Sequence, residues 1–539
     1  MLWDQRGRLE EGKVCKTKGT KSGCPIKSLE TRTPEGENFG THVQGKDRLG
    51  EGEVKQIGIS ATIECVIQDL KKLRQKHVWS WDIIIVAGLA LLFFWLQVRY
   101  LHLAAYPKTD EGIYAEAGAM MMRGLRPYED FPLSHMPLLP FLIGIGLKLF
   151  HGMYPLRLLY LAMNCIAILP LYAVMQKIIT DKFAGIIAIF FYLTFYEMVN
   201  HDFRFLAIRQ TANALFIIYL WLIVAGKPTK LNMLSQCIIA ALSTLLFLPA
   251  AINIAIVSTV VSWNASEFHR KHAYEQSILI YTGIGVTFIL ASILLPGLVQ
   301  ESIVSQLGRD GSDRLTRIGL MALTTWDISF LLMAITGIVI GCQQKKSSII
   351  ACALGFIIFV TIFLPESYYP HYLSLAGPAL AIGAFFLLAW VLKFLEYKFF
   401  IILPFAVGLT VWHLLQAMPS LLKEWKYNPN SDYHALVAIL QKSHAPLLTL
   451  EPIYAVESGL SITEDVIEDA FRMPWKPQNF TNQGTKNMSE EACTILLEAK
   501  ARLYFPIETQ KEWLRKYPVL LHNSSGTVLW TENSFCEKN

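Results

Sequence analysis

Two adjacent carboxylates, Asp110 and Glu111, follow the first long apolar stretch of this chain. Thr109 before them is a typical helix N-cap, and Gly124 is a typical residue just beyond a helix. Apolar residues recur in between at helical spacing, so the sequence predicts a short amphipathic helix over residues 110–123. The helix dipole favours ionised carboxylates in a first turn, and a general base or a cation ligand needs that form. The pair therefore indicates chemistry, although the capping of an exposed helix accounts for the same two residues.

The rest of the chain indicates a membrane protein that positions this pair. Hydrophobic residues make up 53% of the sequence, and the mean hydropathy is +0.37. Apolar runs of about 17 to 22 residues recur, each long enough to cross a hydrocarbon core of about 30 Å. No run alternates polar and apolar residues as a barrel strand does, so we expect an all-α polytopic membrane protein with about 11 transmembrane helices. The net charge of +5 forms no basic stripe, and no nucleic-acid partner is expected. The expected spans are residues 82–103, 154–177, 183–199, 205–225, 231–247, 249–262, 277–296, 326–342, 347–364, 372–392 and 398–416.

The positions of the basic residues set the expected topology. Residues 1–77 are poor in large apolar side chains and predict a disordered cytoplasmic tail, which ends in a basic cluster at 71–77. Basic loops then return to the cytoplasm after every second span. This register requires the short segment 137–150 to lie at the outer interface. Pro249 predicts two short spans within residues 231–262, although one long tilted span is an alternative that would invert the topology downstream.

The chain therefore divides into three parts. The tail is followed by a membrane module at residues 78–416, which carries a large external loop at 104–153. Residues 417–539 lose the long apolar runs and predict a small external α/β domain, periplasmic or luminal. In this domain we expect a helix at 431–442, a strand at 445–450, a helix at 490–501, a strand at 502–506, another helix and a last strand at 527–530. Cys493 and Cys536 lie in it and can pair if the compartment is oxidising.

Three segments carry a resemblance to a known family. Residues 106–118, with the pattern Asp-Glu-x-x-Tyr, are followed by Gly-Leu-Arg-Pro-Tyr at 124–128 and by Pro-Leu at 137–138. They resemble the first external loop of the GT-C glycosyltransferases of the protein O-mannosyltransferase and lipid A aminoarabinose transferase type. Tyr-Pro-His-Tyr-Leu at 369–373 is similar to a helix start near the end of their membrane module, and residues 204–213 are weakly similar to a third segment. The resemblance covers residues 82 to about 400 and implies the GT-C fold.

The family resemblance implies a reaction as well. It is the inverting transfer of a monosaccharide from a polyprenyl-phosphate donor to a hydroxyl of an envelope glycan, a lipid or a protein. The leaving phosphate is weakly basic and needs no general acid, so one carboxylate that deprotonates the acceptor suffices. Asp110 is the expected base, and Glu111 is the second candidate or supports the helix start. The implied location is the plasma (inner) membrane of a bacterium, among membrane lipids, with the active site and the last domain outside.

A leaving phosphate next to hydrocarbon needs cations or other polar partners. The resemblance and the residue types give as candidates Tyr114, His135, Arg204, Arg209, Tyr369 and His371, with Arg309, Arg314 and Arg317 as weaker ones. His135 stands where the family has a lysine, so it would bind phosphate only when protonated. Solvated loop charges and interfacial anchors explain the same arginines and aromatic residues. No cluster has the spacing of metal ligands, so no metal is expected, and a divalent ion at Asp110 or Glu111 is the alternative.

A lipid or solute transporter without transferase activity is the rival class. Transporters place ionisable residues near the midplane of their helices and show paired repeats. The expected spans contain almost no Asp, Glu, Lys or Arg, and no internal repeat is evident. An inactive relative that only binds a glycolipid is a third reading, from which Asp110 distinguishes an enzyme.

Overall fold

The computed structural model describes residues 81–98, 101, 110–131, 133–194, 206–226, 229–263, 267–304, 325–344, 347–363, 370–394, 430–443, 446–449, 452–461, 493–497, 511, 515, 519–522 and 528–531. The predicted tail and the expected last span at 398–416 lie outside these residues.

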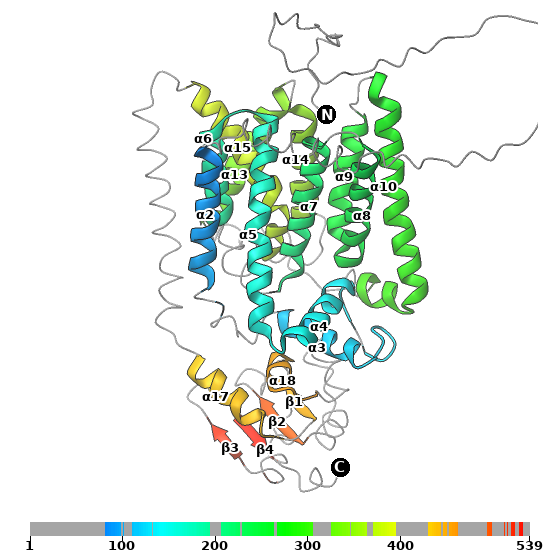
Figure 1. The fold of residues 1–539 in the computed structure, drawn as a ribbon, viewed down its shortest axis with the longest axis vertical. Coiled ribbons are helices and arrows are strands. Elements are labelled where there is room, and N and C mark those ends of the chain that lie inside the picture. Colours follow the sequence, from blue (N-terminus) through cyan, green and yellow to red (C-terminus); the bar gives the residue numbers. More distant parts are fainter. Residues whose placement is uncertain are drawn as a thin grey trace, which may run out of the picture. The chain divides into compact units, whose positions relative to one another are not determined.

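Apolar helices build a bundle (Figure 1). They are α2 (Trp81–Val98), α5 (Met153–Ile178), α6 (Lys182–Thr194), α7 (Ile208–Val224), α8 (Lys230–Leu246), α9 (Leu248–Trp263), α10 (Glu267–Leu294), α13 (Thr325–Gln343), α14 (Ser348–Phe363) and α15 (Gly377–Phe394). Within the described residues, four helical segments are long and apolar enough to cross a membrane, and further helices are apolar but shorter. The chain is an integral membrane protein.

Prolines explain two details of the bundle. The chain turns at Phe247, which is extended between α8 and α9, and Pro249 follows in the first turn of α9. Proline suits a first turn because it has no N–H to place there. The two-helix interpretation of residues 231–262 is therefore confirmed. The second detail is at Pro370, which begins a 3₁₀ helix, η3 (Pro370–Ala376). Because η3 precedes α15, α15 itself begins later than the predicted residue 372.

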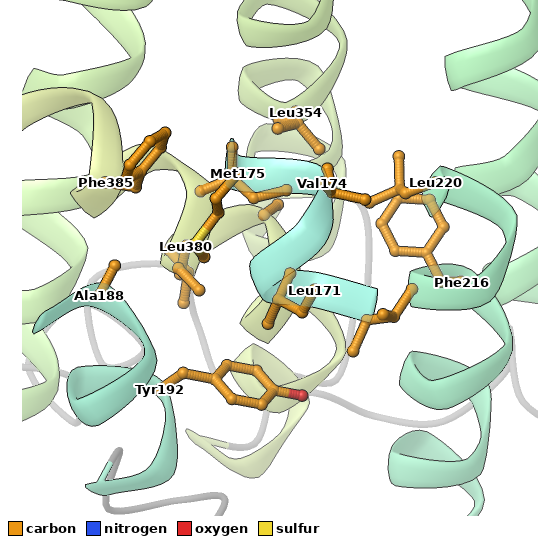
Figure 2. Close-up of a cluster of buried hydrophobic side chains, with 14 of the residues drawn as sticks. Leu171, Val174, Met175, Ala188, Tyr192, Phe216, Leu220, Leu354, Leu380 and Phe385 are labelled. Carbon is orange, nitrogen blue, oxygen red and sulfur yellow. The ribbon is translucent and has the colours of Figure 1, made fainter. Parts of the chain in front are cut away.

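The helices pack through a large apolar core, and Figure 2 shows side chains from several helices that converge there. The labelled side chains are Leu171, Val174 and Met175 of α5, Ala188 and Tyr192 of α6, Phe216 and Leu220 of α7, Leu354 of α14, and Leu380 and Phe385 of α15. Helices α13 and α15 approach closely, because a Cβ atom at Gly383 would lie 2.6 Å from the carbonyl oxygen of Ala334. Small residues allow such close packing where lipid offers no hydrophobic drive for helix association.

Two shorter helices lie at one end of the bundle (Figure 1). Helix α3 (Asp110–Met122) confirms the predicted helix, and Gly124 beyond it has a φ of 94°, which glycine adopts without strain. Its predicted amphipathic character is wrong, because every residue of α3 is buried or half-buried, Glu111 and Glu116 included, so the helix has no exposed polar face. Helix α4 (Leu138–Phe150) confirms that residues 137–150 form a short apolar helix. The two helices touch through their backbones, because a Cβ atom at Gly118 would lie 2.7 Å from the nitrogen of Gly144.

The last part of the chain combines two helices and a sheet. Helices α17 (Asn430–Leu440) and α18 (Pro452–Ser458) accompany a four-stranded sheet of order β1-β2-β4-β3. Strands β1 (Leu447–Thr449) and β2 (Thr494–Leu497) are parallel, and β4 (Val528–Thr531) lies antiparallel to β2 and to β3 (Val519–His522). Helix α17 and the strands β1 and β4 were predicted. Helix α18 and strand β3 were not predicted.

The predicted helix at 490–501 is wrong over its central part, where the chain forms β2. Thr494 and Ile495 are β-branched, and β2 gains hydrogen-bonding partners on both sides, from β1 and β4. This pairing outweighs the local helical pattern of the sequence. The predicted strand at 502–506 lies outside the described residues. Cys493 is disulfide-bonded, and Cys536, the partner considered from the sequence, lies outside the described residues.

Candidate active site

Asp110 begins α3 at the end of the bundle. Its side chain is half-buried, and within the described part of the chain no hydrogen bond or ion pair engages its carboxylate. The neighbouring Glu111 is only 2% exposed. The two adjacent carboxylates therefore have opposite surroundings. Of the two, only Asp110 is partly exposed.

Glu111 forms a buried ion pair with Arg157 of α5. The Nε atom of Arg157 donates to both carboxylate oxygens at 3.0 and 3.1 Å, and its Nη2 donates to Oε2 at 2.6 Å. Both side chains are nearly inaccessible, at 4% and 1%. The backbone N–H of Leu206 donates to Glu111 Oε1 at 3.1 Å. Buried carboxylates require this kind of pairing, so Glu111 anchors the first turn of α3.

The same anchor reaches the start of α7. Tyr160, one turn after Arg157 on α5, donates a hydrogen bond from its hydroxyl to the carbonyl oxygen of Ala207 at 2.5 Å. Leu206 and Ala207 thus connect α7 to α3 and to α5. Arg209 lies in the first turn of α7 and is 9% exposed. The anchor therefore fixes the helix of Asp110 relative to the helix of Arg209.

His135 lies against α3 through an aromatic contact. Its ring meets the ring of Tyr114 edge-on, with the centroids 5.1 Å apart and an interplanar angle of 89°. Ser134 Oγ lies 3.2 Å from His135 Nδ1. Tyr114 is fully buried, four residues after Asp110, and so shares its side of α3. Asp110 and Tyr114 therefore lie on one side of α3, as predicted, and His135 packs against Tyr114 there.

Tyr128 holds the backbone of His135. Its hydroxyl donates to the His135 carbonyl oxygen at 2.7 Å, and burial raises the pKa of this phenol, so it remains a donor. Its φ of 71° is unusual for a residue with a large side chain. Gly297 makes room for it, since a Cβ atom there would lie 3.1 Å from the Tyr128 carbonyl oxygen. An unusual backbone maintained by its surroundings is frequent at functional sites.

Helix η3 is connected to α7 by hydrogen bonds. Asn213 Nδ2 donates to the carbonyl oxygen of Ser374 at 2.7 Å and to Gln210 Oε1 at 3.1 Å. Asn213 and Gln210 are 1% and 2% exposed. His371 lies on η3, whose backbone alone is described at that position. The segment of His371 is thereby tied to the helix that carries Arg209.

The structure thus brings five of the predicted site residues to one end of the bundle or into contact with it: Asp110, Glu111, Tyr114, His135 and Arg209. The others, apart from the backbone of His371, lie outside the described residues: Arg204, Tyr369, Arg309, Arg314 and Arg317. In the described part of the chain, no group of three or more His, Cys, Asp or Glu side chains could hold a metal ion.

Two residues of this site were missed by the sequence analysis. Arg157 is a lone cation near the start of an otherwise apolar span, and an ionisable residue in a span is by itself a signal of function. Tyr128 gave no signal beyond its place in the resemblance, because a positive φ of a tyrosine is not readable from the sequence.

The bundle with two short helices at one end has the GT-C fold. The crystal structure of ArnT from Cupriavidus metallidurans bound to undecaprenyl phosphate superimposes with a TM-score of 0.52 at 13% identity, over 82% of this chain and 98% of that one. The apo structure of ArnT gives 0.53 at 13% identity, over 82% and 97%. No protein-family model matches the sequence, and no curated protein sequence matches it significantly. At this identity the likeness shows the fold alone.

Proposed function

We propose that this protein is an inverting glycosyltransferase that moves a monosaccharide from a polyprenyl-phosphate donor to a hydroxyl acceptor. The observation that carries the proposal is the contrast within one helical turn, where Glu111 is held in a buried ion pair and Asp110 is half-buried and unengaged within the described residues. The GT-C fold supports it, as does the undecaprenyl phosphate bound to ArnT. The site would face the outside of a bacterial inner membrane.

Asp110 is the proposed base. It takes the proton of the acceptor hydroxyl while that oxygen attacks the anomeric carbon of the sugar. The bond from this carbon to the phosphate oxygen breaks, its electron pair leaves with the lipid phosphate, and the anomeric configuration inverts. The phosphate leaves without a proton, so no second carboxylate acts as an acid, unlike in glycosidases. Such a base contributes about 10²- to 10⁴-fold to the rate.

Glu111 is proposed as the support of this base. Its carboxylate oxygens already accept from Arg157 and from Leu206, so a second role as base would require breaking a buried ion pair. Breaking such a pair costs about 3 to 5 kcal/mol. The pair also leaves Glu111 without a free oxygen for the alternative divalent ion.

The donor phosphate is proposed to lie between α3 and the start of α7. Arg209 supplies a permanent charge there, and His135 supplies one when protonated. Tyr114 and the segment of His371 complete the proposed donor site, to which Arg204, Tyr369, Arg309, Arg314 and Arg317 are the further candidates. The acceptor is proposed to be an envelope glycan, a lipid or a protein, and it enters next to Asp110.

The test uses purified protein in nanodiscs and a panel of radiolabelled polyprenyl-phosphate sugars. Asp110→Asn keeps the shape of the side chain and removes the base, so donor turnover should fall at least about 100-fold. Glu129→Gln, at an exposed carboxylate of the loop after α3, is the control and should leave turnover unchanged. Turnover by wild type together with full activity of Asp110→Asn refutes the base assignment. Movement of a lipid or solute across vesicles without turnover of any donor would favour the transporter class.

A further inference from the structure

The C-terminal region packs directly on the helix of the proposed base. A Cβ atom at Gly112, two residues after Asp110, would lie 2.8 Å from the backbone nitrogen of Ile453 at the start of α18. Only glycine permits this approach of α18 to α3. The side chains of both regions belong to one hydrophobic core. It contains Tyr114, Ala115 and Met120 of α3 together with Leu436, Leu447, Ile453, Tyr454 and Ile495 of the C-terminal region.

An ion pair accompanies this packing. Glu457 lies four residues after Ile453 on α18, and its Oε1 is 4.0 Å from Nη1 of Arg157. The other side of the same guanidinium, Nε and Nη2, binds Glu111. Arg157 therefore lies between two carboxylates, one from α3 and one from the C-terminal region. Burial raises the pKa of Glu457, Arg157 opposes this, and Glu111 adds to it.

The fork of the guanidinium makes the two contacts interdependent. A planar guanidinium cannot turn toward one carboxylate without changing its angle to the other. Nε and Nη2 of Arg157 face Glu111, and Nη1 faces Glu457, so a change at either carboxylate acts on the same rigid plane. Glu457 thus adds a charged contact on the side of the guanidinium that Glu111 does not reach. The orientation of Arg157 then fixes Glu111, and Glu111 fixes the first turn of α3.

We propose that Glu457 is a positioning residue for the transfer reaction: from the C-terminal region it orients Arg157, and through Arg157 and Glu111 it holds the turn of α3 that carries Asp110. This inference rests on the proposed function for its catalytic consequence, and on the contacts alone for its structural one. The C-terminal region is accordingly part of the catalytic apparatus.

The first experiment measures kinetics of the full chain with the donor found above. Glu457→Gln keeps the shape and removes the charge, and Glu457→Lys repels Arg157. We expect kcat to fall about 10-fold in the first variant, the size of one charge-assisted contact, and further in the second. The KM for the donor should stay within about twofold, because no donor contact is removed. Glu129→Gln is the matched control for the loss of one carboxylate.

The second experiment needs no substrate. Amide hydrogen exchange of α3 is compared between wild type, Glu457→Gln and Glu129→Gln, with exchange of α5 as internal reference. Faster exchange confined to α3 in Glu457→Gln is expected. Unchanged exchange of α3 together with unchanged kcat overturns the proposal, and so does an equal loss in kcat and in donor binding, which indicates general destabilisation. If wild type turns over no donor, the proposed function fails, and the exchange of α3 still decides whether Glu457 positions it.

Discussion

The contact between α3 and α4 allows a prediction whose sign separates two physical effects. Alanine in the interior of a helix is more favourable than glycine by about 1 kcal/mol, so Gly118→Ala should stabilise the protein if propensity decides. A Cβ atom there would instead lie 2.7 Å from the nitrogen and 3.0 Å from the Cα atom of Gly144. Both are backbone atoms, which cannot rotate away as a side chain can. We therefore predict destabilisation.

The size of the effect follows from the distances. Atoms in van der Waals contact lie about 3.5 to 4.0 Å apart, so α4 has to move by about 1 Å. Overpacking of this kind costs about 1 to 3 kcal/mol, which exceeds the gain in propensity. His135 lies three residues before α4 and would move with it, away from the helix of Asp110. A displacement of about 1 Å can lower kcat by about 10²-fold.

The assay compares thermal unfolding in detergent and donor turnover for Gly118→Ala, Gly144→Ala and Gly88→Ala. Gly144 is the reciprocal position, since a Cβ atom there would lie 2.8 Å from the carbonyl carbon of Gly118. Gly88, inside α2, is the matched control, with nothing within 4 Å of such an atom among the described residues. The first two variants should unfold at lower temperature and the control should not. Equal unfolding temperatures and turnover for Gly118→Ala and Gly88→Ala would refute the reasoning.

Two further predictions concern Tyr128, in the loop after α3, and Glu116, a buried carboxylate of α3. Tyr128→Phe leaves the His135 carbonyl without its donor, so we expect a loss of about 0.5 to 1.5 kcal/mol in unfolding free energy and lower turnover; an unchanged unfolding temperature would contradict this. Burial raises the pKa of Glu116 above 4.5, although Arg123 opposes this at 2.9 Å. Its contribution to stability is therefore complete below pH 4.5 and is lost as the pH rises through the folded-state pKa. Glu116→Gln should flatten this decline in thermal unfolding between pH 4 and 8, and an identical decline in both proteins would show that another group causes it.

The elements around the site were predicted because their signals are local. The helical spacing of apolar residues and Gly124 predicted the C-terminal end of α3 to within one residue. Pro249 predicted the division between α8 and α9. Tyr114 was placed on the face of Asp110 from helical spacing alone. Each of these inferences depends on residues within a few positions of one another, where the geometry of the chain is nearly fixed.

The anchor of the site could not be predicted in the same way. Glu111 and Arg157 are 46 residues apart in the sequence, and Glu457 comes from the far end of the chain. No spacing rule relates them, because tertiary packing alone brings them together. The strand β2 was missed for the same reason, since its partners β1 and β4 determine its conformation.

The contact of Gly112 with Ile453 also constrains how the chain is threaded through the bilayer. Two segments that touch outside the hydrocarbon must lie on the same side of it, so the chain between them crosses an even number of times. If α5, α6, α7, α8, α9, α10, α13, α14 and α15 each cross once, the described helices between α3 and α18 supply an odd number. The number becomes even only if the span predicted from the sequence at 398–416 crosses as well. The composition of that segment is apolar enough for a crossing. The contact between α3, near the start of the chain, and α18, near its end, therefore tests the predicted number of crossings as a whole.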